Sequence, residues 1–217
     1  SIDYLVGTHP HEDHIGGMDN LIRAFRIKAF YMPKVSEKLT PTTATYNDVL
    51  TAAEDKKLKI KSAKAGVTLF EDASIGLKAE ILSPDASLEY SDLNNYSAVI
   101  RLTYGSRSFL FTGDAEVEAE KIMLDGNYEL SADVLKMGHH GSSTSSSDAF
   151  LDAVSPKYAI ISCETGNDYG HPHKETLQKL KKRSIEAFRT DRQQTIIATC
   201  NGTDISFVTG QQSCNKK

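Results

Sequence analysis

The spacing of apolar residues changes along the first 32 positions, and each spacing predicts a different element. Residues 2–6 form a nearly continuous apolar run, which is typical of a buried strand. Ile15, Met18 and Ile22 then recur at helical spacing, and residues 27–32 form a second apolar run. We therefore predict a strand, a short polar loop, a helix and a second strand, in that order.

Alternating patterns and glycine breaks in the next part of the chain predict one helix and several short strands. Residues 42–57 place Tyr46 and Val49 on one helical face. Thr42 or Thr43 is the expected helix cap. Strands are predicted at 58–63, 67–71, 75–82, 96–104 and 108–112. The last two are close enough in sequence to form a hairpin.

Helices and strands alternate in the remaining part of the chain. Helices are predicted at 115–124, 147–154 and 172–182. Strands are predicted at 132–137, 157–163 and 187–190, followed by a hairpin that turns at Asn201-Gly202. Meandering strands followed by alternating helices and strands are typical of an α/β protein in which two sheets carry helices on their outer faces.

Composition and charge then limit the domain organisation. The 217 residues are 39% hydrophobic, which is enough to bury a full core, and the one biased stretch, 142–147, is too short to separate domains. We predict a single domain over residues 1–217. The net charge of -4 argues mildly against an extended grip on DNA, because nucleic-acid binders usually carry a basic excess.

The cysteines and the hydropathy pattern say little about the compartment. Cys163, Cys200 and Cys214 are odd in number and lack metal-type spacing, so we expect free thiols. No apolar run reaches transmembrane length and no signal peptide precedes the domain, which predicts a soluble protein, either cytoplasmic or extracellular. An upstream segment could be missing, because the chain opens almost on its most distinctive motif.

That motif is His9-Pro10-His11-Glu12-Asp13-His14, placed between the first strand and the first helix. Imidazole and carboxylate are the side chains that bind borderline divalent cations. In an extended segment His9 and His11 point the same way, while Asp13 and His14 lie at the turn into the helix and point to a second position nearby. The spacing therefore predicts ligands for two ions.

Further candidate ligands also follow predicted strands. Asp114 ends the strand after the hairpin, His139 and His140 follow the strand 132–137, and His171 lies beyond the strand 157–163. Strand ends on one rim can converge, which predicts a single site. Only one of two adjacent side chains normally points inward from a strand, so His140 is the stronger ligand candidate. His139 is either a second ligand or a histidine outside the ligand group.

The opening motif, the segment Phe-Leu-Phe-Thr-Gly-Asp at 109–114 and the loop Gly-His-His-Gly-Ser at 138–142 together resemble the metallo-β-lactamase superfamily. More narrowly, Asn94-Asn95-Tyr96-Ser97, His-His-Gly-Ser and Tyr169-Gly170-His171-Pro172 in this order resemble the metallo-β-lactamase-type domain of ComEC-type competence proteins, which function in DNA uptake, and its stand-alone relatives. The resemblance covers nearly the whole chain. It implies an αββα four-layer sandwich, whose usual N-terminal strand pair we expect to be missing here.

The resemblance also implies a ligand set for a pair of divalent ions. His9 and His11 would hold the first ion, Asp13 and His14 the second, and Asp114 would bridge the two. His140 would complete the arrangement, with His139 the weaker candidate.

One departure from the superfamily pattern bears on the metal. Many members carry another histidine ahead of the bridging aspartate, where this chain offers only Asn94, Asn95 and Ser97. One ion would therefore have fewer nitrogen ligands, which shifts the expectation from a zinc pair toward manganese or a mixed pair.

The expected chemistry is hydrolysis of a phosphodiester, with single-stranded DNA as a candidate substrate by resemblance. Asp13 and Asp114 would act with two ions, Zn or Mn, that activate a water. His171 would serve as a general acid or as a donor that orients substrate, and a structural histidine near the last helix is its alternative.

Polar residues around the same loops are candidates for substrate binding. Asn94, Asn95 and Ser97 would orient substrate or a ligand in the mouth of the site. Ser142 and Ser143 precede a predicted helix, where hydroxyls and free backbone N–H groups can cradle a phosphate. An ordinary flexible loop with a capping serine is the alternative.

Two other functions stay open from the sequence alone. The first is a small-molecule esterase, since phosphorylcholine esterases resemble the same asparagine-rich and double-histidine elements; an aromatic cage would mark it, and the chain has no Trp. The second is a catalytically weak metal-binding module, which a broken ligand set would mark.

Overall fold

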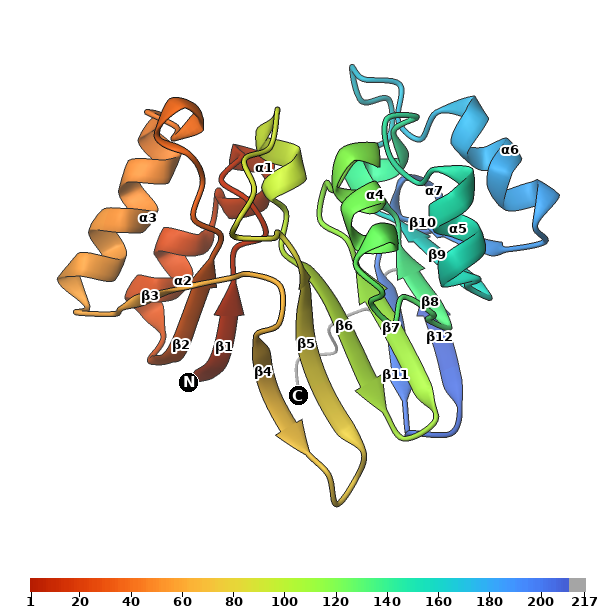
Figure 1. Ribbon diagram of the computed structural model, residues 1–217, viewed down its shortest axis with the longest axis horizontal. Coiled ribbons are helices and arrows are strands. Elements are labelled where there is room, and N and C mark those ends of the chain that lie inside the picture. Colours follow the sequence, from red (N-terminus) through yellow and green to blue (C-terminus); the bar gives the residue numbers. More distant parts are fainter. Residues whose placement is uncertain (211–217) are drawn as a thin grey trace.

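The computed structural model describes residues 1–210, which form two principal sheets packed between outer helices (Figure 1). The strands of the first sheet, in spatial order, are β1 (Ile2–Val6), β2 (Ile27–Met32) and β3 (Ile60–Ser62), all parallel. The second sheet has the order β10-β9-β8-β7-β6-β5-β4, antiparallel from β4 to β7 and parallel from β7 to β10.

The strands of the second sheet are β4 (Thr68–Asp72), β5 (Leu77–Ser83), β6 (Val99–Tyr104), β7 (Arg107–Phe111), β8 (Val134–Lys136), β9 (Tyr158–Ile161) and β10 (Glu186–Arg189). A separate C-terminal hairpin comprises β11 (Ile196–Cys200) and β12 (Ile205–Thr209). The α-helices are α1 (Glu12–Ile15), α2 (Met18–Ala24), α3 (Ala44–Asp55), α4 (Val117–Asp125), α5 (Asp148–Val154), α6 (Lys174–Lys182) and α7 (Thr190–Gln193). Single 3-10 turns are η1 (Glu37–Leu39), η2 (Leu93–Tyr96) and η3 (Gly138–Gly141).

Three hydrophobic clusters fill the spaces between four layers. Strand β2 shows the division, because successive side chains on a strand point to opposite faces. Phe30 and Met32 pack with residues of α2 and α3, whereas Ala29 and Tyr31 pack with residues of β5. A third and larger cluster lies between the second sheet and helices α4, α5 and α6. The order helix, sheet, sheet, helix confirms the predicted α/β sandwich (Figure 1).

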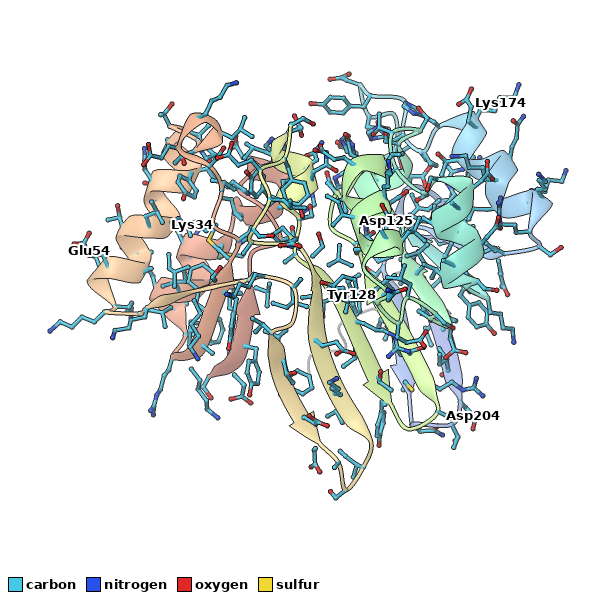
Figure 2. All side chains as sticks on the ribbon, in the orientation of Figure 1. Lys34, Glu54, Asp125, Tyr128, Lys174 and Asp204 are labelled. Atoms are coloured by element: carbon cyan, nitrogen blue, oxygen red, sulfur yellow. The ribbon has the colours of Figure 1, made fainter. Side chains whose placement is uncertain are left out.

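The polar faces of the outer helices point away from the sheets. Figure 2 shows Glu54 on α3 and Lys174 on α6 at opposite outer flanks of the molecule. Cys163 and Cys200 are half-buried free thiols, and Cys214 lies outside the described residues. Within residues 1–210, the helices are all too short or too polar to cross a membrane.

The predicted elements are present, with boundaries that are shorter or shifted by a few residues. The first predicted helix is two helices, α1 and α2, interrupted at Gly16 and Gly17, and Thr43 rather than Thr42 caps α3 by accepting the N–H of Tyr46 (3.3 Å). The strand predicted to begin at 96 starts at Val99, because η2 occupies the preceding residues.

Candidate metal centre

The loop after β1 changes conformation at His11, and this change sets the direction of its ligands. His11 has extended backbone (φ -77°, ψ 148°) and α1 begins at the next residue. Asp13 and His14 therefore lie on the first helical turn, whereas His9 lies in the extended part of the loop. The two pairs of side chains consequently leave the backbone in different directions.

Four of the candidate ligands converge on one position. Asp13, His14, Asp114 and His140 each offer one ligand atom, and these atoms all lie within 4.8 Å of one another. Nε2 of His14 is 3.1 Å from Oδ1 of Asp114 and 3.3 Å from Nε2 of His140. Nε2 of His140 is 3.1 Å from Oδ2 of Asp13. Two carboxylates and two imidazoles form a donor set that suits a borderline divalent cation.

The polar atoms of this group fit a cation. Asp114 is 2% exposed, and its Oδ1 has no hydrogen-bond partner among the described residues. Burial alone would raise the pKa of Asp114, but the imidazole rings of His14 and His140 beside the carboxylate outweigh it and hold the pKa below its ordinary value. Asp114 in turn raises the pKa of His140 through a hydrogen bond. The buried carboxylate thus demands positive charge, which a bound cation supplies.

The adjacent histidines His139 and His140 both face Asp114. They lie in the turn η3 with positive φ angles (46° and 55°), not on a strand, so the alternation expected for strand residues does not apply. Nδ1 of His140 donates to the carbonyl of Ser162 (2.7 Å), which leaves its Nε2 free as a ligand. Nε2 of His139 is 3.9 Å from Oδ2 of Asp114.

His139 is oriented by a carboxylate that the sequence analysis did not single out. Nδ1 of His139 lies 2.9 Å from Oε1 of Glu116. The same oxygen accepts hydrogen bonds from the Thr144 hydroxyl (2.8 Å) and the Asn94 amide (3.3 Å). A carboxylate on the outer nitrogen of a metal-ligating imidazole fixes the ring and raises its basicity.

His9 and His11 face a second position beside the first. Nε2 of His9 is 3.0 Å from Nδ1 of His11, so both nitrogens point to one place. His9 is fully buried, and burial lowers its pKa to about 3, which keeps the ring neutral as a ligand must be. Within the described part of the chain only the first group unites three or more ligand atoms, so this second position is the poorer one.

Asn95 and Ser97 lie beneath the site, not in its mouth as expected. Oδ1 of Asn95 accepts the backbone N–H groups of Glu116 and Ala119 and so holds the start of α4. Oγ of Ser97 accepts the N–H of Asp114 (2.9 Å) and lies 3.3 Å from Nδ1 of His9. Both side chains are buried, and their hydrogen bonds support the predicted role of orienting a metal ligand, whereas a substrate contact by either stays a prediction.

Asn94 differs from Asn95 and Ser97, because it lines the main cavity. Its Oδ1 is buried and has no partner among the described residues. A substrate contact by Asn94 therefore stays a prediction.

The serine loop is not an open phosphate cradle. Its backbone N–H groups at Ser146 and Ser147 donate to the carboxylate of Glu120 (2.5 and 2.9 Å), which is almost completely buried. Ser142 is buried with its hydroxyl 3.0 Å from that of Thr144. The N–H of Ser143 donates to His173. An internal carboxylate thus takes the N–H groups of Ser146 and Ser147 at the start of α5, and a substrate contact by Ser142 or Ser143 stays a prediction.

An open cavity of about 800 Å³ gives access to the first ligand group. Asp13, Asp114, His140 and His171 are among its lining residues. The His171 ring stacks on that of His140 (centroids 6.2 Å apart, 18° between planes), and burial lowers the pKa of His171. His171 therefore lines the same cavity as five of the predicted metal ligands, which are His11, Asp13, Asp114, His139 and His140.

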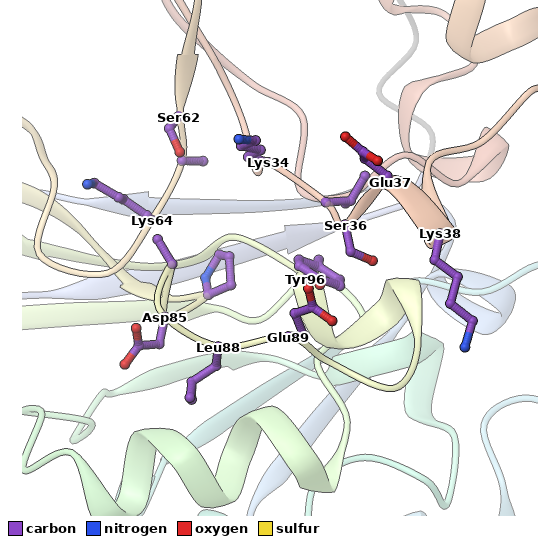
Figure 3. A pocket seen from close by; sticks show the side chains of 14 residues that line it. Lys34, Ser36, Glu37, Lys38, Ser62, Lys64, Asp85, Leu88, Glu89 and Tyr96 are labelled. Carbon is purple, nitrogen blue, oxygen red and sulfur yellow. The ribbon is translucent and has the colours of Figure 1, made fainter.

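A second cavity, of about 780 Å³, lies on the other side of η2 (Figure 3). Tyr96 lines this cavity, whereas Asn94 of the same turn lines the first. Its lining includes Lys34, Lys64 and Glu89 but neither histidine nor cysteine. Of these two cavities, only the first is therefore lined by imidazole side chains.

Comparison with known protein families assigns this chain to a superfamily. The family model described as "Metallo-beta-lactamase superfamily" matches residues 1–165. The chain belongs to this superfamily. The match includes the opening motif, Asp114 and the His139-His140 turn, which carried the resemblance to the superfamily, whereas Tyr169-Gly170-His171-Pro172, part of the narrower resemblance, lies beyond it.

Curated proteins similar to this chain include a ComE operon protein, a competence protein and a recombination protein. The chain is 37% identical to ComE operon protein 3 of Bacillus subtilis over 198 residues, which are 90% of this chain and 24% of that protein. It is 39% identical to competence protein ComA of Neisseria gonorrhoeae over 54% of this chain and 17% of that protein. Recombination protein 2 of Haemophilus influenzae is 32% identical over 83% of this chain and 20% of that protein. The chain spans about a quarter or less of these relatives' length.

Solved structures show the same superfamily fold at low sequence identity. A mutant of CmlA beta-hydroxylase matches with a TM-score of 0.57 and 13% identity, covering 87% of this chain and 43% of that one. Igni18, a metallo hydrolase from the archaeon Ignicoccus hospitalis, matches with a TM-score of 0.52 and 15% identity, covering 96% of this chain and 80% of that one. These structures share the fold of this chain, which belongs to the superfamily and carries a candidate metal site.

Proposed function

We propose that this superfamily member is a dinuclear metal-dependent phosphodiesterase that acts on nucleic acid, with single-stranded DNA as the favoured substrate. The observation that carries the proposal is the position of Asp114. Its carboxylate lies within 4 Å of ring nitrogens of His14, His140 and His139, on the floor of an open cavity. A carboxylate so placed can be shared by two neighbouring ions.

The proposed ligand sets follow from the two groups of nitrogens. Asp13, His14 and His140 would hold one ion with Asp114, and His9 and His11 would hold the other near His139. The second set lacks the additional histidine that many superfamily members carry ahead of the bridging aspartate, and Oγ of Ser97 lies 3.3 Å from Nδ1 of His9 in that region. Zinc and manganese are both compatible with such mixed imidazole and carboxylate sets.

When bound, a pair of divalent ions lowers the pKa of a water and neutralises charge that develops on a phosphoryl group. Asp13 and Asp114 supply the negative charge that holds the ions. His171 lines the same cavity, and its ring nitrogens have no hydrogen-bond partner within residues 1–210. Because its lowered pKa keeps His171 neutral at pH 7, we assign it to orient a phosphoryl oxygen by hydrogen bonding.

The names of the relatives support nucleic acid as the substrate class. Two are described as competence or ComE operon proteins and one as a recombination protein. The two proposed ions would also make the cavity mouth locally positive in a chain of net charge -4, which favours a phosphate ester.

The test combines metal analysis with hydrolysis of bis(p-nitrophenyl) phosphate and of single-stranded DNA. Asp114→Ala and His11→Ala should each reduce both activities by at least about 100-fold. Asp125→Ala is the matched control, because Asp125 is an exposed carboxylate at the end of α4 (Figure 2). Full activity in Asp114→Ala would refute a shared carboxylate.

Other outcomes distinguish the remaining functions of the same site. Cleavage of the small ester without cleavage of DNA would identify a small-molecule esterase. Stoichiometric metal with no turnover of either compound would identify a metal-binding module.

A further inference from the structure

Tyr169 is unusually exposed for an aromatic residue at the edge of the cavity. It is 79% exposed, whereas the next most exposed large hydrophobic residues in the described part of the chain reach 49%. It lines the same cavity as Asp114 and His140. It belongs to the segment between β9 and α6, which projects at the top of Figure 1.

The Tyr169 ring is the outer member of a column of nearly parallel rings. It stacks on His171 with centroids 5.7 Å apart and 19° between the planes. His171 stacks in turn on His140, at 6.2 Å and 18°. Since Nε2 of His140 lies 3.1 Å from Oδ2 of Asp13, the column leads from solvent to the metal ligands.

The segment that carries Tyr169 is anchored by side-chain hydrogen bonds. Oδ1 of Asn167 accepts the N–H of His171 (2.9 Å), and Nδ2 of Asn167 donates to the carbonyl of the same residue (2.7 Å). Nε2 of His173 donates to the carbonyl of Tyr169 (3.1 Å). These bonds fix the backbone around Tyr169, and because its ring stacks on His171 on one side and is 79% exposed, its other face is available to a ligand.

We propose that Tyr169 stacks on an unpaired nucleobase next to the scissile phosphate and thereby makes the site selective for single strands. The inference rests on the proposed phosphodiesterase function. Every nucleobase presents a flat face that stacks on an aromatic ring, and such stacking tolerates any sequence. A base in a duplex is already covered on both faces by its neighbours, so it cannot extend the column without leaving the helix.

The experiment compares an oligothymidylate with an abasic oligomer that has the same number of phosphates. Binding is measured by fluorescence anisotropy in EDTA, which prevents hydrolysis, and kcat/KM is measured with metal. The wild type should prefer the base-bearing oligomer by about 5- to 100-fold. Tyr169→Ala should reduce this preference to near unity without weakening the abasic oligomer, and Tyr169→Phe should retain it.

The two readouts separate this inference from the proposed function. Base-dependent binding that requires Tyr169, without any hydrolysis, would support stacking and refute the phosphodiesterase. Hydrolysis of both oligomers with equal kcat/KM, or a preference that survives in Tyr169→Ala, would refute stacking and leave the phosphodiesterase intact. A loss of binding to both oligomers in Tyr169→Ala would also overturn the inference, because a stacking residue should spare the abasic chain.

Discussion

Glu116 contacts the nitrogen of His139 that faces away from Asp114. Its removal should leave the His139 ring free to rotate, because Thr144 alone would remain near Nδ1. We expect Glu116→Ala to reduce metal affinity and hydrolysis about 10- to 100-fold. Glu116→Gln keeps an acceptor oxygen and should lose less. Metal titration with phosphodiester turnover measures both effects.

Glu54→Ala is the matched control for Glu116→Ala, because Glu54 is an exposed carboxylate on α3 and is remote in sequence from the candidate ligands. Unchanged metal affinity in Glu116→Ala would show that His139 needs no orienting partner.

His9 should make the metal-free protein sensitive to acid. Burial lowers its pKa from 6.5 to about 3, so below pH 6.5 the unfolded chain binds a proton that the folded chain does not. The free energy of unfolding therefore has its full value above pH 6.5 and decreases as the pH drops toward 3. The slope contributed by one such group is at most about 1.4 kcal/mol per pH unit.

Urea unfolding in EDTA at several pH values measures this dependence. His9→Gln removes the titrating ring and should flatten the curve between pH 6.5 and 4. A His9→Gln curve parallel to that of the wild type would assign the acid sensitivity to other groups.

At the level of elements, the apolar pattern located nearly every strand and helix but could not describe the turns around the site. The alternation in β2 is visible in the sequence because each face contacts a different layer. The orientation of His139 and His140 cannot be seen in the sequence, because it depends on positive φ angles in η3. Similarly, Glu116 and Glu120 gain their roles from loops distant in sequence, which no local spacing reveals.

Glu120 joins two of these elements, since its carboxylate on α4 accepts N–H groups at the start of α5. Its replacement by Gln exchanges one acceptor oxygen for an amide donor and leaves a buried N–H without a partner. We expect Glu120→Gln to lower the free energy of unfolding by about 1–3 kcal/mol. Metal content should be unchanged, because Glu120 lies outside the ligand group.

Denaturant unfolding tests the Glu120 prediction, with Glu54→Gln as the control at an exposed helical position. Equal stability of the two variants would show that the serine loop finds other partners for its N–H groups.

For the molecule as a whole, the candidate metal centre lies where the two sheets meet. His9, His11, Asp13 and His14 follow β1 of the first sheet, whereas Asp114 and the His139-His140 turn follow β7 and β8 of the second. Each sheet is fixed to its own helices by a separate hydrophobic cluster, and only one cluster lies between the sheets. Shared metal ligands would therefore add a second connection between the two halves.

Metal binding should consequently stabilise the whole fold and not only the loops. A ligand present at about 100 times its Kd contributes about 2.7 kcal/mol to the folded state. In a domain of this size, that contribution raises Tm by about 5–10 °C. Calorimetry with and without EDTA should show this difference for the wild type and for Asp125→Ala. It should be largely absent in Asp114→Ala, because Asp114 contacts ligands from both halves. A metal-dependent Tm shift that persists in Asp114→Ala would place the stabilising ion elsewhere in the molecule.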